Sequence, residues 1–238
     1  METNDINIYV AGTHRDVWSE QLLTNHKERH KFFVEMEHSG DNIDYLNKWY
    51  CEQTALYHLL KNTTEPIIGL EHYRTQIYED NGSDLMSPDT IHKLLEEYDI
   101  IAGIWDYEGR KNGVSLKKNL NLWLKGELRL LYDAIKKVRP EFMPYVDDFI
   151  KPLGGYHIAC NIFIARREII QEYWDYMWTI LQEYERVSPL TSQNLRREGY
   201  VYEFLFGAWI RMRKLRLRKS KVIKRTKTLK GIQGETDI

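Results

Sequence analysis

The chain has 238 residues, of which 42% are hydrophobic and 29% charged, a composition typical of a globular protein with a sizeable core. No apolar stretch approaches ~18 residues, the polar start has no hydrophobic run, and the two cysteines have no metal-ligand spacing. We therefore expect no membrane span, no signal peptide, no disulfide scaffold and a cytoplasmic location.

The net charge of −1 conceals an uneven distribution of charge. Nine Lys or Arg and no acid lie between Lys214 and Lys230, so the rest of the chain has 25 of the 34 basic residues against all 35 acidic ones. We interpret 1–213 as the folded domain and 214–238 as a basic tail. Apolar residues interleave with the tail's cations, which favours binding to an anionic membrane surface; a solvated end that balances an acidic body is the alternative.

Hydrophobic periodicity predicts short buried strands alternating with amphipathic helices. In chain order we expect a strand over 6–10, a helix over 45–62, a strand over 66–70, a helix over 87–98, a strand over 99–104, a helix over 120–138, a short helix over 144–150, a strand over 157–165, and helices over 167–186 and 192–213. This alternation predicts an α/β fold with a mostly parallel central sheet flanked by helices, and a helical C-terminal part.

Polar side chains follow three of the predicted strands. The clusters are Thr13-His14-Arg15, Glu71-His72-Tyr73-Arg74 and Trp105-Asp106-Tyr107-Glu108. Because ligands bind at the carboxyl ends of strands in open α/β sheets, parallel strands would bring these clusters to one edge. The sequence therefore predicts a site at this edge.

The second cluster has the highest density of functional groups. Arg74 could hold a phosphate through two parallel hydrogen bonds, and His72 could donate a hydrogen bond, act as a base or bind a metal. An ordinary surface ion pair between Arg74 and Glu71 explains the same pattern.

Metal binding has one weak candidate in the sequence. Asp106 and Glu108, two positions apart in a loop, could hold a divalent cation, although solvated loops often carry such pairs. The chain lacks the phosphate-binding loops of kinases and dehydrogenases and the motifs of zinc proteases and serine hydrolases. These enzyme classes therefore lose their usual support.

A second polar cluster lies in the last predicted helix. Gln193, Arg196 (or Arg197) and Tyr200 fall near one face, and Glu203 follows three residues after Tyr200 among aromatic and aliphatic residues. A carboxylate in apolar surroundings tends to have a raised pKa, which suits a general base. Pairing of Glu203 with a nearby Arg is the alternative.

Four ordered segments resemble the signature blocks of one family. They are Asn42 to Asn62, which resembles N-I-S-x-K-N-x-x-Y-C-E-L-T-A-L-Y-W-x-W-K-N, Ile68 to Arg74, which resembles I-G-L-x-H-Y-R-R, Asn161 to Ile164, which resembles N-M-F-I, and Gln193 to Glu203, which resembles Q-x-R-x-x-G-x-x-x-E-R-L. The family was catalogued as a domain of unknown function. It recurs in bacterial capsular and surface-polysaccharide gene clusters and is regarded as a glycosyltransferase family with a GT-A-like fold.

This resemblance implies a single GT-A-like domain that transfers a sugar from a nucleoside-diphosphate sugar, with UDP favoured, to a lipid-linked saccharide in capsular, exopolysaccharide or lipopolysaccharide synthesis. It implies that Glu203 is the base for the acceptor hydroxyl, and that His72 and Arg74 stand where such folds place the acidic motif that binds metal and diphosphate. Mg²⁺ or Mn²⁺ dependence and metal-independent transfer both stay open. The residues expected to contact nucleotide sugar or acceptor are Thr13, His14, Arg15, Asn47, Glu52, Thr54, Tyr57, Tyr73, Arg74, Asn161, Gln193 and Arg197.

The chain departs from the family pattern at several positions. Thr75 replaces the second Arg of H-Y-R-R, His58-Leu59-Leu60 replaces the Trp-x-Trp stretch, and Phe204 replaces the Arg after Glu203. Thr75 is the main support for an alternative function, a catalytically inactive scaffold of a polysaccharide-synthesis complex. A nucleic-acid-binding module that uses the basic tail is a further alternative, but the acidic body and the absence of a nucleic-acid motif argue against it.

Overall fold

A computed structural model describes residues 5–15, 23, 25–106, 115–151, 156–220, 222–226 and 234–236, with backbone alone for 106 and for the last two segments. Strands in these residues belong to one sheet. They are β1 (Ile6–Gly12), β2 (Arg29–Phe33), β3 (Ile67–His72), β4 (Thr75–Ile77), β5 (Ile100–Asp106), β6 (Tyr156–Arg166), β7 (Leu217–Ser220), β8 (Val222–Thr226) and β9 (Gly234–Thr236). The four strands that the sequence predicts correspond to β1, β3, β5 and β6.

Helices fill most of the remaining described chain. They are the 3-10 turn η1 (Asp44–Leu46), α2 (Asn47–Tyr50), α3 (Gln53–Asn62), α4 (Pro88–Glu97), α5 (Leu116–Trp123), α6 (Leu128–Val138), η2 (Pro140–Phe142), α7 (Met143–Ile150), α8 (Arg167–Val187) and α9 (Arg197–Met212). The start of α4 follows its sequence, because Ser87 accepts a hydrogen bond from the Thr90 N–H at 3.3 Å and Pro88 occupies the first turn.

The sheet confirms the α/β class but is mixed rather than mostly parallel in its pairings. β1 pairs in parallel with β2 and β3, and β5 pairs in parallel with β7. β6 lies between β3 and β5 and runs antiparallel to both. β3 and β5 therefore still point the same way, and their carboxyl ends meet at the edge of the sheet that also holds the end of β1. The carboxyl ends of β1, β3 and β5 therefore lie at one edge of the sheet, as predicted, although β6 separates β3 from β5.

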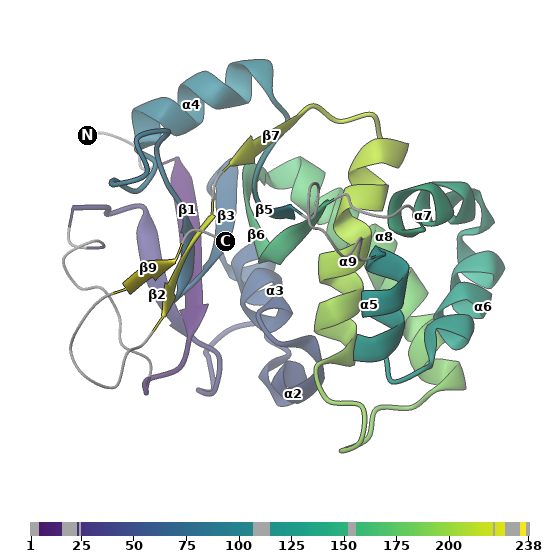
Figure 1. The fold of residues 1–238 in the computed structure, drawn as a ribbon. Helices are drawn as coiled ribbons and strands as arrows, with labels where there is room; N and C mark the ends of the chain where they lie inside the picture. Colours follow the sequence, from purple (N-terminus) through teal and green to yellow (C-terminus); the bar gives the residue numbers. More distant parts are fainter. Residues whose placement is uncertain are drawn as a thin grey trace.

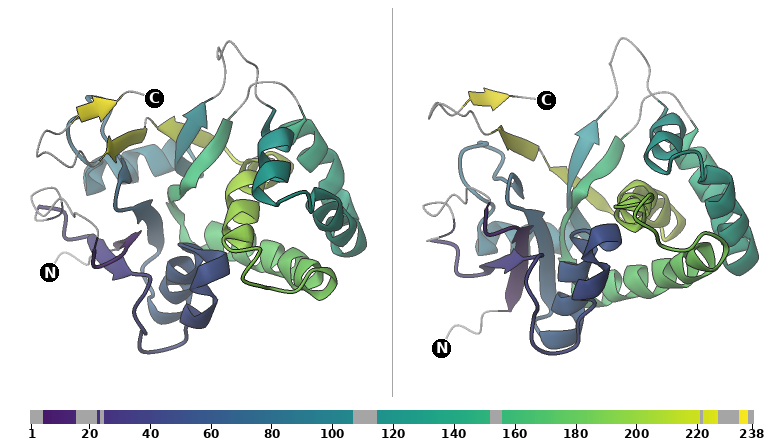
Figure 2. Two further views of the ribbon diagram at one scale, coloured as in Figure 1. Left: turned by 60° about the horizontal axis from the view of Figure 1, so that its bottom comes forward. Right: turned by 90° about the horizontal axis from the view of Figure 1, so that it is seen from below.

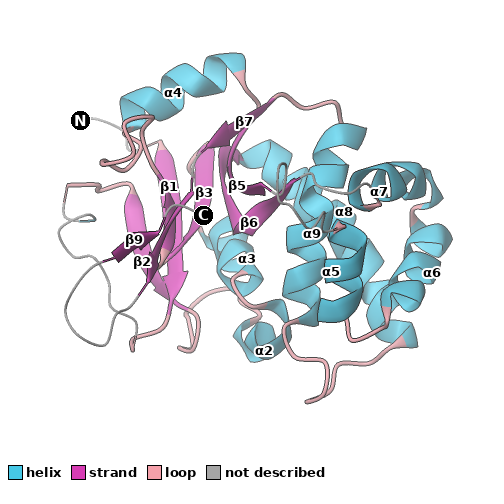
Figure 3. Ribbon diagram, viewed as in Figure 1, coloured by secondary structure: helices cyan, strands magenta, loops and turns pink. Residues whose placement is uncertain are grey.

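Helices cover both faces of the sheet (Figure 1). On one face α4 packs through Ile91 and Leu95 against isoleucines of the strands. The opposite face carries a larger core to which α3, α8 and α9 contribute. Figure 2 shows α9 between the sheet and an outer layer formed by α5 and α6, and Figure 3 shows α5 to α9 gathered on one side of the strands. This packing fixes α9, and therefore Glu203, against the middle of β6.

Two predicted helices are shorter or more broken than the sequence pattern indicated. The helix expected over 45–62 is interrupted at Cys51, whose φ of 53° and ψ of −132° end α2 before α3 begins. The helix expected over 192–213 begins at Arg197, because Arg196 takes a left-handed conformation with φ of 66°. Periodicity continues through both positions, so the pattern of apolar residues gave no sign of these breaks.

The boundary predicted at Arg213 is corrected by the sheet. In the described part of 214–238, β7 pairs with β5, β8 pairs with β4, and β9 pairs with β8. Arg216 binds Asp99 at 3.0 Å and Arg218 binds Asp80 at 2.7 Å, so two cations of the expected tail neutralise acids of the domain. Among the described residues, no helix combines the length and the apolar character that crossing a bilayer requires.

Candidate active site

The ends of β1 and β3 form one side of the candidate site. Tyr73 donates its backbone N–H to the Ala11 carbonyl at 2.9 Å, which ties the loop after β3 to the end of β1. After β1, Thr13 is partly exposed and His14 and Arg15 are exposed. His14 contacts the Glu35 carboxylate through its ring and donates its backbone N–H to it at 2.8 Å. The first two predicted clusters are therefore neighbours at one edge.

A tight turn between β3 and β4 presents the basic cluster. His72 pairs with Thr75, so Tyr73 and Arg74 form the connection. The rings of His72 and Tyr73 lie 4.6 Å apart, and the Arg74 guanidinium lies 4.9 Å from the centre of the Tyr73 ring. Arg74 is exposed and its guanidinium packs on the Tyr73 ring, an arrangement that suits the binding of an anion.

Glu71 does not belong to this exposed cluster. Its side chain is buried, and its carboxylate accepts hydrogen bonds from Arg29 Nε at 3.1 Å and from the Ile77 N–H at 3.1 Å. Arg29 also contacts Glu28 at 2.5 Å and donates to the Met86 carbonyl. The ion pair considered between Glu71 and Arg74 is therefore wrong, since Glu71 pairs with Arg29 inside the fold.

Thr75 also lies inside the fold. It is 2% exposed and pairs with Lys224 in the sheet. The replacement of the second Arg of the family pattern by Thr75 therefore changes the packing of a buried strand. It does not change a side chain that could contact a ligand. This removes much of the support that Thr75 gave to an inactive scaffold.

A kink in β6 forms the floor of the site. Cys160 and Asn161 have φ values of 47° and 56°, a conformation that non-glycine residues adopt rarely. The pairing of β6 with β5 shifts register at the same level, between Ala102 and Ile104. The kink directs the Cys160 N–H to Glu203 Oε1 at 3.1 Å and the Asn161 amide to Glu52 Oε1 at 2.8 Å. One irregular segment thus contacts two carboxylates, one from the turn between α2 and α3 and one from α9.

The turn between α2 and α3 positions Glu52. Asn47 donates through Nδ2 to the Cys51 carbonyl at 3.0 Å and to Thr54 Oγ1 at 3.2 Å, and the Thr54 hydroxyl donates to the same carbonyl at 3.0 Å. Thr54 is fully buried. Asn47 and Thr54 were expected to contact the nucleotide sugar; these bonds instead favour a role in holding the turn that presents Glu52.

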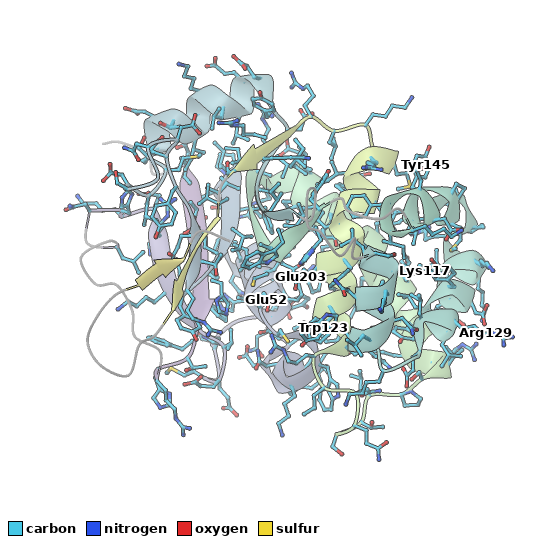
Figure 4. The ribbon with its side chains drawn as sticks, in the orientation of Figure 1. Glu52, Lys117, Trp123, Arg129, Tyr145 and Glu203 are labelled. Atoms are coloured by element: carbon cyan, nitrogen blue, oxygen red, sulfur yellow. The ribbon has the colours of Figure 1, made fainter. Side chains whose placement is uncertain are left out.

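Glu52 and Glu203 form a carboxylate pair in which the charge of Glu203 acts on Glu52, and Figure 4 labels the two side chains beside each other. Burial and, next, the negative charge of Glu203 raise the pKa of Glu52 to about 7, against the opposing effects of the Asn161 amide and Arg196. A carboxyl group with this pKa exchanges protons near neutral pH and suits general base catalysis. Its neighbour Cys51 is no competing nucleophile, because burial, reinforced by the Glu52 charge, raises the thiol's pKa to about 12.

His157 is a functional candidate that the sequence did not single out. Its Nε2 lies 2.9 Å from Glu203 Oε1, and its ring stacks on Phe204 with centres 4.7 Å apart. Together with the Cys160 N–H, it holds one oxygen of Glu203 in place. The only indication of His157 in the sequence was a single His within an apolar strand. A histidine buried in the core without a function would give the same pattern. Phe204, noted as a departure from the family pattern, supports this ring.

Arg197 and Gln193 are not brought to the carboxylates. Arg197 is 1% exposed, its guanidinium binds Glu198 at 2.5 Å and Glu127 at 3.1 Å, and it lies over the Tyr184 ring. Its expected contact with sugar or acceptor is therefore wrong, because these partners occupy it in the core. Gln193 is exposed in the loop before α9, where its carbonyl contacts Lys125.

The remaining candidates are separate from the carboxylate pair. The Tyr57 hydroxyl donates to Asp41 at 2.9 Å, and its ring packs on Trp174. The backbone of Asp106 ends β5, whereas its side chain and all of Glu108 lie outside the described residues. Within the ranges given above, no group of three His, Cys, Asp or Glu side chains could hold a metal ion.

Gly199 allows α9 to approach the turn that carries Glu52. A Cβ at this position would lie 3.2 Å from both Cβ and Sγ of Cys51 and 3.3 Å from the Tyr50 carbonyl oxygen. We expect Gly199→Ala to lower the free energy of unfolding by about 1 kcal/mol, because a cost of ~1–3 kcal/mol from overpacking is partly offset by ~1 kcal/mol of helix propensity. Urea denaturation measures this change, and a more stable variant would contradict the close packing.

Comparison with known proteins gives a family and a fold. Residues 16–214 match the model of the family described as "Domain of unknown function (DUF4422)", and the chain belongs to that family. Its structure is similar to the apo structure of WbbM, a bifunctional glycosyltransferase, with a TM-score of 0.68 and 19% sequence identity. The match covers 91% of this chain but 45% of the WbbM chain, so this protein spans less than half of that structure. No curated protein matches the sequence.

Proposed function

We propose that this chain is a glycosyltransferase that moves a sugar from a nucleoside-diphosphate sugar to a saccharide acceptor. The observation that carries the proposal is the Glu52–Glu203 pair, in which Glu52 has a pKa of about 7 and lies beside the kinked strand β6. The likeness in fold to a bifunctional glycosyltransferase supports the same class of function.

In this proposal Glu52 is the general base that takes the proton of the acceptor hydroxyl. Glu203 supplies the negative charge that helps to raise the pKa of Glu52, and His157 and the Cys160 N–H orient Glu203. This assignment moves the base from Glu203, the candidate named from the sequence, to its neighbour. Asn161 donates to Glu52 and fixes the direction of the carboxylate.

The leaving diphosphate is proposed to bind at the ends of β1 and β3. Arg74 is exposed and stacked on Tyr73, and His72 adjoins both, so the turn offers donors to the oxygens that gain negative charge as the sugar leaves. Thr13, His14 and Arg15 follow β1 next to this turn and would contact the nucleotide. Mg²⁺ or Mn²⁺ could share this role, and we leave transfer with and without a metal as two outcomes of the assay.

The finer assignments are part of the same proposal. We favour UDP as the nucleotide and a lipid-linked saccharide of capsular, exopolysaccharide or lipopolysaccharide synthesis as the acceptor. A lipid-linked acceptor would hold the protein at the inner face of the plasma membrane, where basic residues from Lys221 to Lys230 would gain roughly 1 kcal/mol each from anionic lipid.

Thermal stabilisation by nucleotides tests the proposal without knowledge of the acceptor. UDP, GDP and CMP are added at about 100 times their dissociation constant, where a ligand of the native state adds about 2.7 kcal/mol. For a chain of this size we expect the Tm to rise by about 5–10 °C with the matching nucleotide. Release of that nucleotide from its sugar donor then identifies an enzyme. No response to any nucleotide would favour the scaffold, and salt-sensitive RNA binding in its place would favour the nucleic-acid module.

A further inference from the structure

Two aromatic rings from different helices meet beside the carboxylate pair. Trp123 at the end of α5 and Tyr200 in the first turn of α9 have ring centres 4.5 Å apart and planes inclined by 47°. Trp123 is 48% exposed, and Tyr200 is partly exposed. The two rings together present aromatic surface to solvent at the junction of α5 and α9.

Tyr200 connects this pair of rings to the proposed reaction centre. It precedes Glu203 by three residues on α9, so the two side chains are neighbours on one helical face. Burial raises the pKa of Tyr200, with further contributions from the charges of Glu203 and Glu52, which places the phenol within electrostatic reach of both carboxylates. In the view of Figure 4, Trp123 is labelled just below Glu203 and Glu52, whereas Lys117 and Arg129 are labelled farther to the right.

A cation completes the edge of this surface. The Arg196 guanidinium lies 5.4 Å from the centre of the Tyr200 ring, and its charge acts on both Cys51 and Glu52. Arg196 is exposed, and because its guanidinium has five N–H donors, its hydrogen bond to the Cys51 thiol leaves others for a ligand that rests on the rings. The surface therefore combines apolar ring faces with a donor on one side and two carboxylates on another.

This combination matches the chemistry of a pyranose. A pyranose ring has an apolar face of C–H groups, which packs on aromatic side chains, and a rim of hydroxyls, which need hydrogen-bond donors and acceptors. A ring seated on Trp123 and Tyr200 would direct hydroxyls at Arg196 and at the carboxylates. An extended polyanion would instead meet the negative charges of Glu52 and Glu203.

We propose that Trp123, Tyr200 and Arg196 form the subsite for the sugar unit of the acceptor whose hydroxyl is deprotonated by Glu52. This inference rests on the proposed glycosyltransferase function. It assigns the acceptor, as a saccharide that presents the apolar face of a pyranose ring, to the side of the carboxylates formed by α5 and α9. The nucleotide then occupies the other side, at the ends of β1 and β3.

The test uses the full chain and methyl glycosides of glucose, galactose and mannose as probes. Binding is followed by saturation-transfer NMR, which requires no turnover, and acceptor KM is measured with the donor found in the nucleotide screen. We expect Trp123→Ala to raise the acceptor KM about tenfold and to abolish the NMR signal, with donor hydrolysis in the absence of acceptor unchanged. Trp123→Phe should restore part of the affinity.

Leu122→Ala is the matched control, because Leu122 is the preceding residue on α5 and is 73% exposed. Trp123→Ala with wild-type binding and KM would overturn the subsite. Donor hydrolysis without binding of any glycoside would also overturn it, while leaving the transferase function standing. Glycoside binding that Trp123→Ala abolishes, in a protein that uses no donor, would support the subsite and reject the transferase function.

Discussion

Glu52→Gln is expected to lower kcat for sugar transfer by a factor of ~10²–10⁴, the contribution of a positioned general base. Gln keeps the shape of the side chain and still accepts the hydrogen bond that Asn161 Nδ2 donates at 2.8 Å. It cannot accept the proton of the acceptor hydroxyl. Binding of the nucleotide, measured by thermal shift, should stay at the wild-type level, because the proposed diphosphate site lies at the ends of β1 and β3.

The pH dependence distinguishes the two carboxylates. With Glu52 as the base, the rate should fall as the pH drops through the pKa of about 7, because protonation removes the base. Glu203→Gln removes a charge that raises this pKa, so the fall should move to lower pH while transfer persists. If Glu203→Gln abolishes transfer and Glu52→Gln retains it, Glu203 is the base and our assignment is wrong.

Arg74→Ala should reduce transfer by ~10²–10³, the usual cost of losing one donor to developing negative charge. The fold should persist, because Arg74 is exposed and its guanidinium packs on the adjacent Tyr73 ring rather than in the core. Arg74→Lys should recover part of the activity, since it keeps the charge but loses the planar pair of donors.

The control for Arg74→Ala is Arg129→Ala, which removes an exposed guanidinium on α6, far from the strand ends (Figure 4). Melting curves of both variants should match that of the wild type. A fully active Arg74→Ala protein would remove the diphosphate role from this turn, and a variant that fails to bind nucleotide would strengthen it.

Four strands could be predicted from the sequence because each buried strand is a short run of mostly apolar residues. Ile67 to Leu70 is buried on both faces, as its uninterrupted apolar run indicates. β2 could not be predicted, since its sequence Arg-His-Lys-Phe-Phe is mostly polar. It forms because its backbone pairs with β1, an interaction that side-chain pattern does not record.

The candidate site, like the sheet, could be predicted only where side-chain identity indicates it. Glu203 was recognisable as a carboxylate among apolar residues, and Glu52 and Asn161 came from the resemblance to a family. What brings them together is the backbone of Cys51, Cys160 and Asn161, with φ values of 53°, 47° and 56°. Local propensity disfavours such angles, and tertiary contacts impose them. Hydrophobic periodicity and composition therefore could not indicate which residues adopt positive φ values.

The last strands also determine when the fold can be completed. Asp99 and Arg216 bind each other across 117 positions, and β7 then covers the outer edge of β5. Until the ribosome has delivered that segment, β5 presents unpaired N–H and C=O groups from Ile100 onward, and β4 likewise awaits β8. Pairings of such long range form late and slowly. The nascent chain is therefore most exposed to edge-to-edge aggregation before β7 and β8 have been synthesised.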